Sequence, residues 1–312
     1  MSLHGVIVIN KPAQLTSQAV VTRVKRILHV RKAGHTGTLD PFATGVLPVC
    51  LNEGTKLAAF LIEQEKEYEG VLRLGVETDT QDSTGTVLRE HDPVSLTLED
   101  IEEAFSAFRG VIRQMPPMYS ALKHEGVRLY EFARQGIEIQ REERKVTVSE
   151  LTILGADLPF MKFRVVCSKG TYVRTLVHDI GKRLGCGAVL HQLIRTRSGQ
   201  FHIGQAIDLE TLKAMSPESV SEKLIRPHEA MKIYPEIVVD DVSAGKIRQG
   251  RVVPVAGIPK ASSWPQGRER KFRILTGSGD LLAMAEALPQ RDDMETENYG
   301  CAWRLLRVFA LD

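Results

Sequence analysis

The sequence contains little cysteine, few aromatic residues and no long run of apolar side chains. Its 4 cysteines among 312 residues lie far apart, and its 9 histidines form no H-E-x-x-H pair, so we expect neither a disulfide framework nor a metal site. No stretch approaches the roughly 18 consecutive apolar residues of a membrane span. The first residues also lack the charged and then apolar order of a secretory signal. We therefore expect a cytoplasmic protein that does not bind a membrane.

The overall composition is that of an ordinary globular protein. Hydrophobic residues make up 43% of the chain and charged residues 26%, which excludes disordered, collagen-like and coiled-coil proteins. At roughly 100–200 residues per domain, the length suggests two domains.

Acidic residues are absent from the N-terminal part of the chain. Residues 1–39 carry six basic side chains and no acidic one, and residues 162–197 carry eight basic side chains and one acidic one. Residues 63–103 compensate with thirteen acids against three bases. Such segregation permits one strongly positive face, which would suit a polyanion such as nucleic acid. The alternative is that these are solvated faces of separate elements.

Hydrophobic periodicity indicates a mixture of strands and helices. Apolar or alternating runs at 5–9, 68–74 and 162–168 predict strands, and a helix capped by Thr16 or Ser17 should follow the first. There is no regular βαβ rhythm, so we predict an α+β fold in which a largely antiparallel mixed sheet is flanked by helices. Past residue 228 the chain turns to short strand-like runs. We therefore divide it into a main domain, 1–228, and a small, mostly β domain, 229–312.

The most distinctive segment is Gly34–Pro48, which reads GHTGTLDPFATGVLP. It is rich in glycine, but neither a G-K-[ST] ending nor a G-x-G-x-x-G motif is present, so nucleotide cofactors are not expected. Asp40 is its only carboxylate. Because an Asp-Pro pair is a good helix start, Asp40 could cap a helix instead of taking part in chemistry.

This segment resembles the catalytic motif of the bacterial tRNA pseudouridine-55 synthases. Five further motifs follow the order found in that family. They are Asn10-Lys11-Pro12 with Thr16-Ser17, Glu65–Tyr68, Leu74–Asp82, Met115–Lys123 and Ser168–Leu176. The C-terminal part is similar, more weakly, to the small β-barrel RNA-binding domain called PUA. One departure is Gln14, where many members have glycine, and it matters if the turn there needs a positive φ.

The resemblance implies an isomerase that converts uridine 55 of the tRNA T-loop to pseudouridine by base flipping. The family needs no cofactor, and we expect a monomer whose partner is the T-stem-loop of tRNA. Asp40 corresponds to the essential aspartate, either as nucleophile or as base. Arg174 corresponds to the cation that keeps this carboxylate charged, and Tyr68 to the tyrosine that stacks on the uracil and takes the C5 proton.

The resemblance also assigns residues to substrate binding. His35 corresponds to the residue that fills the space of the flipped base. Lys11, Pro12 and Leu193 correspond to residues that support the pocket, and Tyr172 is expected to pack beneath it. An insertion at about 111–141 corresponds to a segment that grips RNA, where Tyr119, Lys123 and Arg128 would contact bases and phosphates.

Three other functions remain open from the sequence. A non-catalytic RNA-binding or tRNA-folding protein could use the same basic face, although a pure binder has no need of Asp40 beside a polyanion. A guide-RNA-dependent synthase is a second possibility, without evident basic tails for assembly. A glycosidase is the third, although only one carboxylate lies in the motif.

Overall fold

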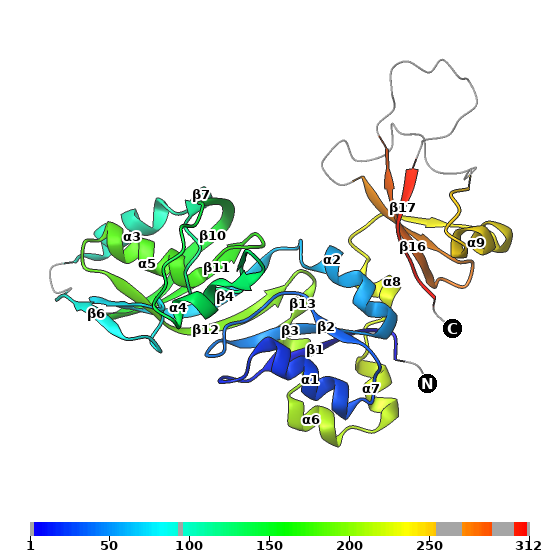
Figure 1. The fold of residues 1–312 in the computed structure, drawn as a ribbon, viewed down its shortest axis with the longest axis horizontal. Helices are drawn as coiled ribbons and strands as arrows, with labels where there is room; N and C mark the ends of the chain where they lie inside the picture. The colour runs from blue at the N-terminus through cyan, green and yellow to red at the C-terminus, as the bar shows by residue number, and fades with distance from the viewer. Residues whose placement is uncertain (1–2, 93–95, 254–269, 289–302, 311–312) are drawn as a thin grey trace, which may run out of the picture.

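A computed structural model describes residues 3–92, 96–253, 270–288 and 303–310 of the protein. The molecule is elongated, with a main unit that carries a long sheet and a smaller C-terminal unit packed at one end (Figure 1). We refer to residues 235–310 as the C-terminal unit.

The secondary structure follows a mixed order. The main unit contains β1 (Gly5–Lys11), α1 (Ser17–Ile27), β2 (Ala33–His35), β3 (Thr44–Leu51), η1 (Asn52–Leu57), α2 (Ala58–Leu61), β4 (Lys66–Leu74), β5 (Val76–Thr78), β6 (Val87–Glu90), α3 (Leu98–Ser106), β7 (Gly110–Gln114), β8 (Lys123–His124), β9 (Val127–Arg128), α4 (Leu129–Ala133), β10 (Arg144–Asp157), β11 (Phe160–Cys167), α5 (Val173–Arg183), β12 (Ala188–Ser198), β13 (Phe201–His202), η2 (Ile203–Gln205), α6 (Leu209–Ala214), α7 (Pro217–Lys223) and α8 (Pro227–Ala230). The C-terminal unit contains β14 (Glu236–Val238), α9 (Asp241–Arg248), β15 (Lys271–Leu275), β16 (Leu281–Ala287) and β17 (Trp303–Val308).

The main sheet has the strand order β1-β3-β12-β4-β11-β10-β7, with β2 beside β3 and β13 beside β12. All neighbouring strands along this path are antiparallel except β3 and β12, which are parallel. The predicted largely antiparallel mixed sheet is therefore confirmed. The parallel pair brings β3, which follows the Asp40 loop, next to β12 in the interior of the sheet.

Local sequence signals account for several of these elements. The Thr16 hydroxyl accepts a hydrogen bond from Ala19 N at 3.1 Å and caps α1. Alternate residues of β4 face the core, so the strand is buried on one side and partly exposed on the other. Thr97 and Asp100 form the reciprocal capping box at the start of α3.

Two apolar cores lie along the main unit. One joins β4, β10, β11 and β12 to α3 and α5, and it includes Leu39 and Tyr68. The other packs α1 and α6 against β1 and β3. The segment Gly34–Pro48 contributes Leu39 and Ala43 to the first core and Leu47 to the second, so both cores help to fix its position.

The C-terminal unit is a four-stranded sheet in the order β14-β15-β16-β17. The predicted small β-rich unit is confirmed, but it also contains the helix α9, which its strand-like sequence pattern does not predict. A third core crosses from this unit to the main one, where Met284 and Phe309 pack with Val6, Val46 and Phe60. Cys50, Cys167 and Cys186 are buried and free, and Cys301 lies outside the described residues.

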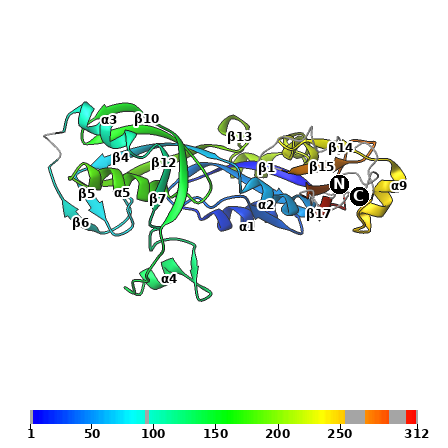
Figure 2. The same cartoon turned by 90° about the horizontal axis from the view of Figure 1, so that it is seen from above.

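The expected RNA-gripping insertion leaves the sheet between β7 and β10. Residues 110–114 form β7, the edge strand, and the β8–β9 hairpin and α4 follow. Seen from above, α4 stands well away from the body of the main unit (Figure 2).

Candidate active site

Asp40 lies within the loop that joins β2 to β3. The hydroxyl of Ser17, the first residue of α1, donates to Leu39 O at 3.1 Å and accepts from Leu39 N at 2.8 Å, which fixes the backbone beside Asp40. No helix begins at Pro41. Instead Ala43 N donates to Asp40 O at 3.1 Å in a turn, and β3 starts at Thr44. The alternative in which Asp40 caps a helix is therefore wrong, because the chain needs a turn here to enter the sheet.

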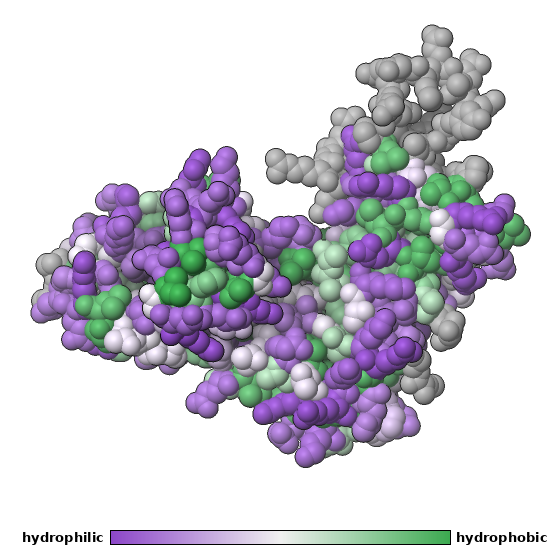
Figure 3. Space-filling view, viewed as in Figure 1, coloured by the Kyte–Doolittle hydropathy of each residue, from purple (hydrophilic) through white to green (hydrophobic). Residues whose placement is uncertain are grey.

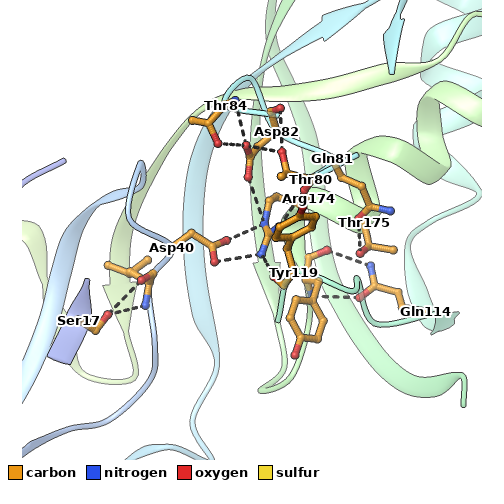
Figure 4. Close-up of polar contacts among 12 residues, drawn as sticks. Ser17, Asp40, Thr80, Gln81, Asp82, Thr84, Gln114, Tyr119, Arg174 and Thr175 are labelled. Atoms are coloured by element: carbon orange, nitrogen blue, oxygen red, sulfur yellow. Dashed lines mark hydrogen bonds and ion pairs between the residues drawn. The ribbon is translucent and has the colours of Figure 1, made fainter. Parts of the chain in front are cut away.

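Arg174 meets Asp40 in a two-pronged ion pair (Figure 4). Its Nε donates to Asp40 Oδ2 at 2.8 Å and its Nη2 to Oδ1 at 3.0 Å. Its remaining bonds go to the carbonyl oxygens of Thr80 and Tyr119, both at 2.8 Å. Planar bidentate pairs of this kind hold both partners in one geometry. Four donated hydrogen bonds leave Arg174 little freedom to move to another acceptor.

A second carboxylate faces the same guanidinium. Asp82 Oδ2 lies 3.7 Å from Arg174 Nε, while its Oδ1 accepts from Thr80 Oγ1, Thr84 N and Thr84 Oγ1. Arg174 is the second residue of α5, whose first turn carries no acid. A cation at the positive end of a helix dipole is unfavourable, so the two carboxylates compensate for this placement.

The ion pair is unequally exposed to solvent. The Asp40 side chain is 35% exposed, whereas those of Arg174 and Asp82 are 4% and 6% exposed. One negatively charged group therefore faces outward while the cation behind it is buried. This arrangement could present a reactive carboxylate to a bound molecule.

Lys11 holds the Asp40 loop at Pro41, the residue that follows Asp40. It is fully buried, and its Nζ donates to the carbonyl oxygens of Pro12, Leu15 and Pro41 at 2.9, 2.7 and 3.1 Å. Pro12 itself is exposed and contacts Lys11 through its carbonyl group. Gln14 has φ of 66°, so this turn does need the conformation that glycine adopts most easily. Burial lowers the pKa of Lys11 to about 8.

Tyr68 lies on β4 directly opposite Arg195 on β12. Its side chain is buried, and burial raises its pKa, whereas the charge of the Arg195 guanidinium lowers it. His35 ends β2 and accepts from Gly37 N at 3.3 Å through Nδ1. Burial, and then the charge of Arg195, lower the pKa of His35.

Leu193 and Tyr172 lie at different elements of the main unit. Leu193 is buried on β12 in the same core as Tyr68 and also lines a cavity of about 560 Å³ together with Phe42 and Gly70. Tyr172 precedes α5 and is half-buried. Gln114, at the end of β7, accepts from Tyr172 N at 3.1 Å and donates to Tyr172 O at 3.3 Å, so the root of the insertion is tied to the helix that carries Arg174.

The three residues of the insertion that are expected to bind RNA lie in two separate places. Tyr119 lies beside the ion pair, where its carbonyl bonds Arg174 and its hydroxyl is 3.4 Å from Asp79 Oδ2. Lys123 and Arg128 are cross-strand partners on the exposed β8–β9 hairpin. The structure thus brings Asp40, Arg174 and Tyr119 together, while the hairpin cations stand apart.

Two family models match consecutive parts of the chain. "TruB family pseudouridylate synthase (N terminal domain)" matches residues 25–173, and "tRNA pseudouridylate synthase B C-terminal domain" matches residues 174–231. The protein named tRNA pseudouridine synthase B from Syntrophotalea carbinolica is 42% identical over 308 residues, which are 98% of each chain. The protein of the same name from Geotalea uraniireducens is 44% identical over 311 residues, 99% of each.

This chain belongs to the TruB family of pseudouridylate synthases. It is therefore an isomerase. A solved structure described as a Cbf5-Nop10-Gar1 complex contains a chain with the same fold, with a TM-score of 0.75 and 29% identity over 99% of this chain and 85% of that one. Within the described residues no group of three or more His, Cys, Asp or Glu side chains could hold a metal ion, and no helix there is long and apolar enough to cross a membrane.

Sequence reasoning missed two charged residues of this TruB-family site. Asp82 ends the motif Leu74–Asp82, and its contact with Arg174 was not predicted. The threonines at 80 and 84, which bond its carboxylate, are the local signal for it. Arg195 was counted only among the charges of a basic segment. No pattern in the sequence distinguishes a buried arginine from an exposed one, because long-range strand pairing decides its burial.

Proposed function

We propose that this protein is a tRNA pseudouridine synthase that isomerises uridine 55 in the T-loop, with Asp40 as the essential carboxylate. The curated relatives that match nearly the whole chain are named as tRNA enzymes, which supports tRNA as the substrate. We further propose that it acts in the cytoplasm as a monomer, and that the C-terminal unit is a PUA-like RNA-binding domain.

The observation that carries this proposal is the ion pair between Asp40 and Arg174. An RNA-binding surface gains nothing from an outward carboxylate, because phosphates repel it. An enzyme that attacks or deprotonates a nucleoside needs one. Arg174 compensates the charge of Asp40 and is held by four hydrogen bonds, so it is unsuited to a phosphate contact.

The reaction rearranges bonds without net oxidation or reduction. The N1–C1′ bond breaks, the uracil turns while it is held, and C5 bonds to C1′. The C5–H bond then breaks, its electron pair restores the C5=C6 double bond, and N1 takes up a proton from solvent. In this scheme Asp40 acts next to C1′ and C6 as nucleophile or base. The Tyr68 oxygen first releases its own proton to solvent and then receives the C5 proton.

The other residues of the site then have roles in binding. His35, which is half-buried at the end of β2, fills the place of the flipped base. Lys11, Pro12, Leu193 and Tyr172 shape the pocket. On the insertion, Tyr119 closes the site beside Arg174, while Lys123 and Arg128 contact the RNA backbone.

Product mapping tests this proposal. Wild type, Asp40→Asn and a control, Asp208→Asn, are incubated with an unmodified T-stem-loop transcript, and pseudouridine is mapped at nucleotide resolution. We expect modification at position 55 by wild type and Asp208→Asn and none by Asp40→Asn. Modification at another nucleotide would contradict the proposed substrate position. Tight binding by wild type without any pseudouridine would favour the alternative of an RNA-binding protein.

A further inference from the structure

Arg195 is a charged side chain buried in the middle of the main sheet. It is 1% exposed, and no ion pair joins it to any carboxylate among the residues that the structure describes. Arginine is almost never fully buried unless it is paired, because an unpaired buried charge loses its hydration without compensation. A side chain of this kind calls for an explanation beyond packing.

The strand register places Arg195 between two parts of the active site. Its backbone pairs with Gly45 on β3 and with Tyr68 on β4. Its guanidinium donates to Val46 O at 2.7 Å and to Gly37 O at 3.1 Å, on either side of Asp40 in the chain. Because Arg195 and Tyr68 are directly opposite each other across β12 and β4, their side chains lie on the same face of the sheet, and the charge of Arg195 acts on the Tyr68 hydroxyl. One group thus acts on both the Asp40 loop and the tyrosine.

The electrostatic surroundings make this position more unfavourable for a cation. Lys11 and Lys66 are also buried, and the pKa of each is lowered to about 8, first by burial and further by the charge of Arg195. Asp40 is the nearby acid that acts on Lys11, and it is already paired with Arg174. A neutral hydrogen-bond donor could hold the Asp40 loop without repelling Lys11 and Lys66. The positive charge of Arg195 therefore needs an explanation of its own.

We propose that Arg195 is a positioning residue for pseudouridine formation, which holds the Tyr68 oxygen and balances the negative charge of that oxygen when it removes the C5 proton. The inference rests on the proposed function. In the step concerned, Tyr68 has first released its own proton to solvent. The C5–H bond then breaks, its electron pair restores the C5=C6 double bond, the C5 proton passes to the Tyr68 phenolate oxygen, and N1 takes up a proton from solvent.

The groups that face Tyr68 indicate why a cation is needed there. Burial raises the pKa of Tyr68, and the charge of Arg195 is the largest influence in the opposite direction. Cys167 on β11 and Asp40 on its loop both raise the pKa further. Without Arg195, every remaining neighbour named here would disfavour the ionised oxygen.

A double-mutant cycle tests whether Arg195 acts through Tyr68. The single-turnover rate is measured at saturating RNA for wild type, Arg195→Met, Tyr68→Phe and the double variant. We expect each single substitution to lower the rate by about 100-fold, as for loss of a general acid or base. In the Tyr68→Phe background, Arg195→Met should lower it by less than about threefold, because groups that act as a unit are not additive. If the two effects multiply, Arg195 only maintains the structure and the proposal is wrong.

Ultraviolet titration of the tyrosines gives a readout that does not depend on activity. The difference between wild type and Tyr68→Phe isolates the ionisation of Tyr68 among 6 tyrosines. The same difference in the Arg195→Met background should appear at higher pH, and in the Arg195→Lys background close to that of wild type. An unchanged titration in Arg195→Met would overturn the proposal, even if the rate falls.

The control is Arg109→Met, which removes a guanidinium that bonds Leu151 O at 2.9 Å and pairs with Glu102. It should leave both the rate and the Tyr68 titration unchanged. If Arg195→Met does not fold, the titration of Tyr68 is compared in Arg195→Lys and Arg195→Gln instead. The proposal expects the wild-type titration in the charged lysine variant and a shift to higher pH in the neutral glutamine variant. Failure of the proposed function appears separately, as a wild type that forms no pseudouridine.

Discussion

The residues around Asp40 form a chain of charges that alternate in sign. Asp82 is fixed by the Thr80 and Thr84 hydroxyls and faces Arg174, which in turn grips Asp40. Each link is buried except the last. A carboxylate held in this way reaches a substrate without reorienting, and preorganised charge is a large contribution to enzyme catalysis.

Replacement of Arg174 by leucine tests the central link of this chain. We expect Arg174→Leu to lower the single-turnover rate by about 1,000-fold, because Asp40 loses both its fixed orientation and its counter-charge. Binding of the T-stem-loop, measured by filter retention, should stay within about threefold of wild type, since no phosphate contact is removed. A near-native rate would refute the role of the pair. Arg109→Leu is the control, and Arg174→Lys distinguishes the effect of charge from that of geometry if the leucine variant melts at a lower temperature.

At the scale of elements, α1 joins the active-site loop to a basic surface. Its first residue fixes Leu39, and its exposed side carries Arg23, Lys25 and Arg26. None of these three has an ion pair within the part of the chain that the structure describes. The surface over α1 and α6 is mostly hydrophilic in the space-filling view (Figure 3). These cations are therefore exposed on the helix whose first residue fixes the Asp40 loop, and we expect them to bind RNA phosphates.

Neutralisation of α1 should weaken RNA binding and reduce its salt dependence. The variant Arg23→Gln/Lys25→Gln/Arg26→Gln keeps side chains that form helices well. We expect the slope of log affinity against log salt concentration to become less steep by about 0.7–0.9 for each phosphate that the variant no longer neutralises. The single-turnover rate at saturating RNA should not change. An unaltered slope, measured by titration from low to high salt, would show that this helix does not bind RNA.

Sequence patterns predicted those elements whose signals are local. The Thr16 cap and the strand pattern at 68–74 lie within a few residues of the structures they specify. The pairing of β3 with β12, and hence the burial of Arg195, depends on residues about 150 positions apart, which periodicity does not reveal. Asp40 and Arg174 could be predicted as partners only through the family resemblance, because 134 positions separate them.

At the scale of the whole molecule, the two units share one apolar core. Leu275, Leu281, Met284 and Phe309 of the C-terminal unit pack against β1, β3 and α2. Around this core, Lys56 Nζ donates to Val308 O at 2.8 Å and Glu53 accepts from Ala310 N at 2.9 Å. A buried interface of this kind fixes the distance between the C-terminal unit and Asp40. The second unit can therefore set how an RNA lies across the first.

Phe309→Ala tests whether the interface couples the two units. Phe309 is 2% exposed, and its truncation should reduce the free energy of unfolding by about 3–5 kcal/mol. Hydrogen exchange should increase on both sides of the interface, in β1 and β3 as well as in β16. Phe272→Ala is the matched control, because Phe272 packs with Trp303 inside the C-terminal unit and its truncation should raise hydrogen exchange only there.

If Phe309→Ala leaves exchange in β1 and β3 unchanged, the units are stable independently, and RNA affinity should then be the same in both variants. If the interface does fix the second unit, Phe309→Ala should weaken binding of full-length tRNA while binding of the isolated T-stem-loop is preserved.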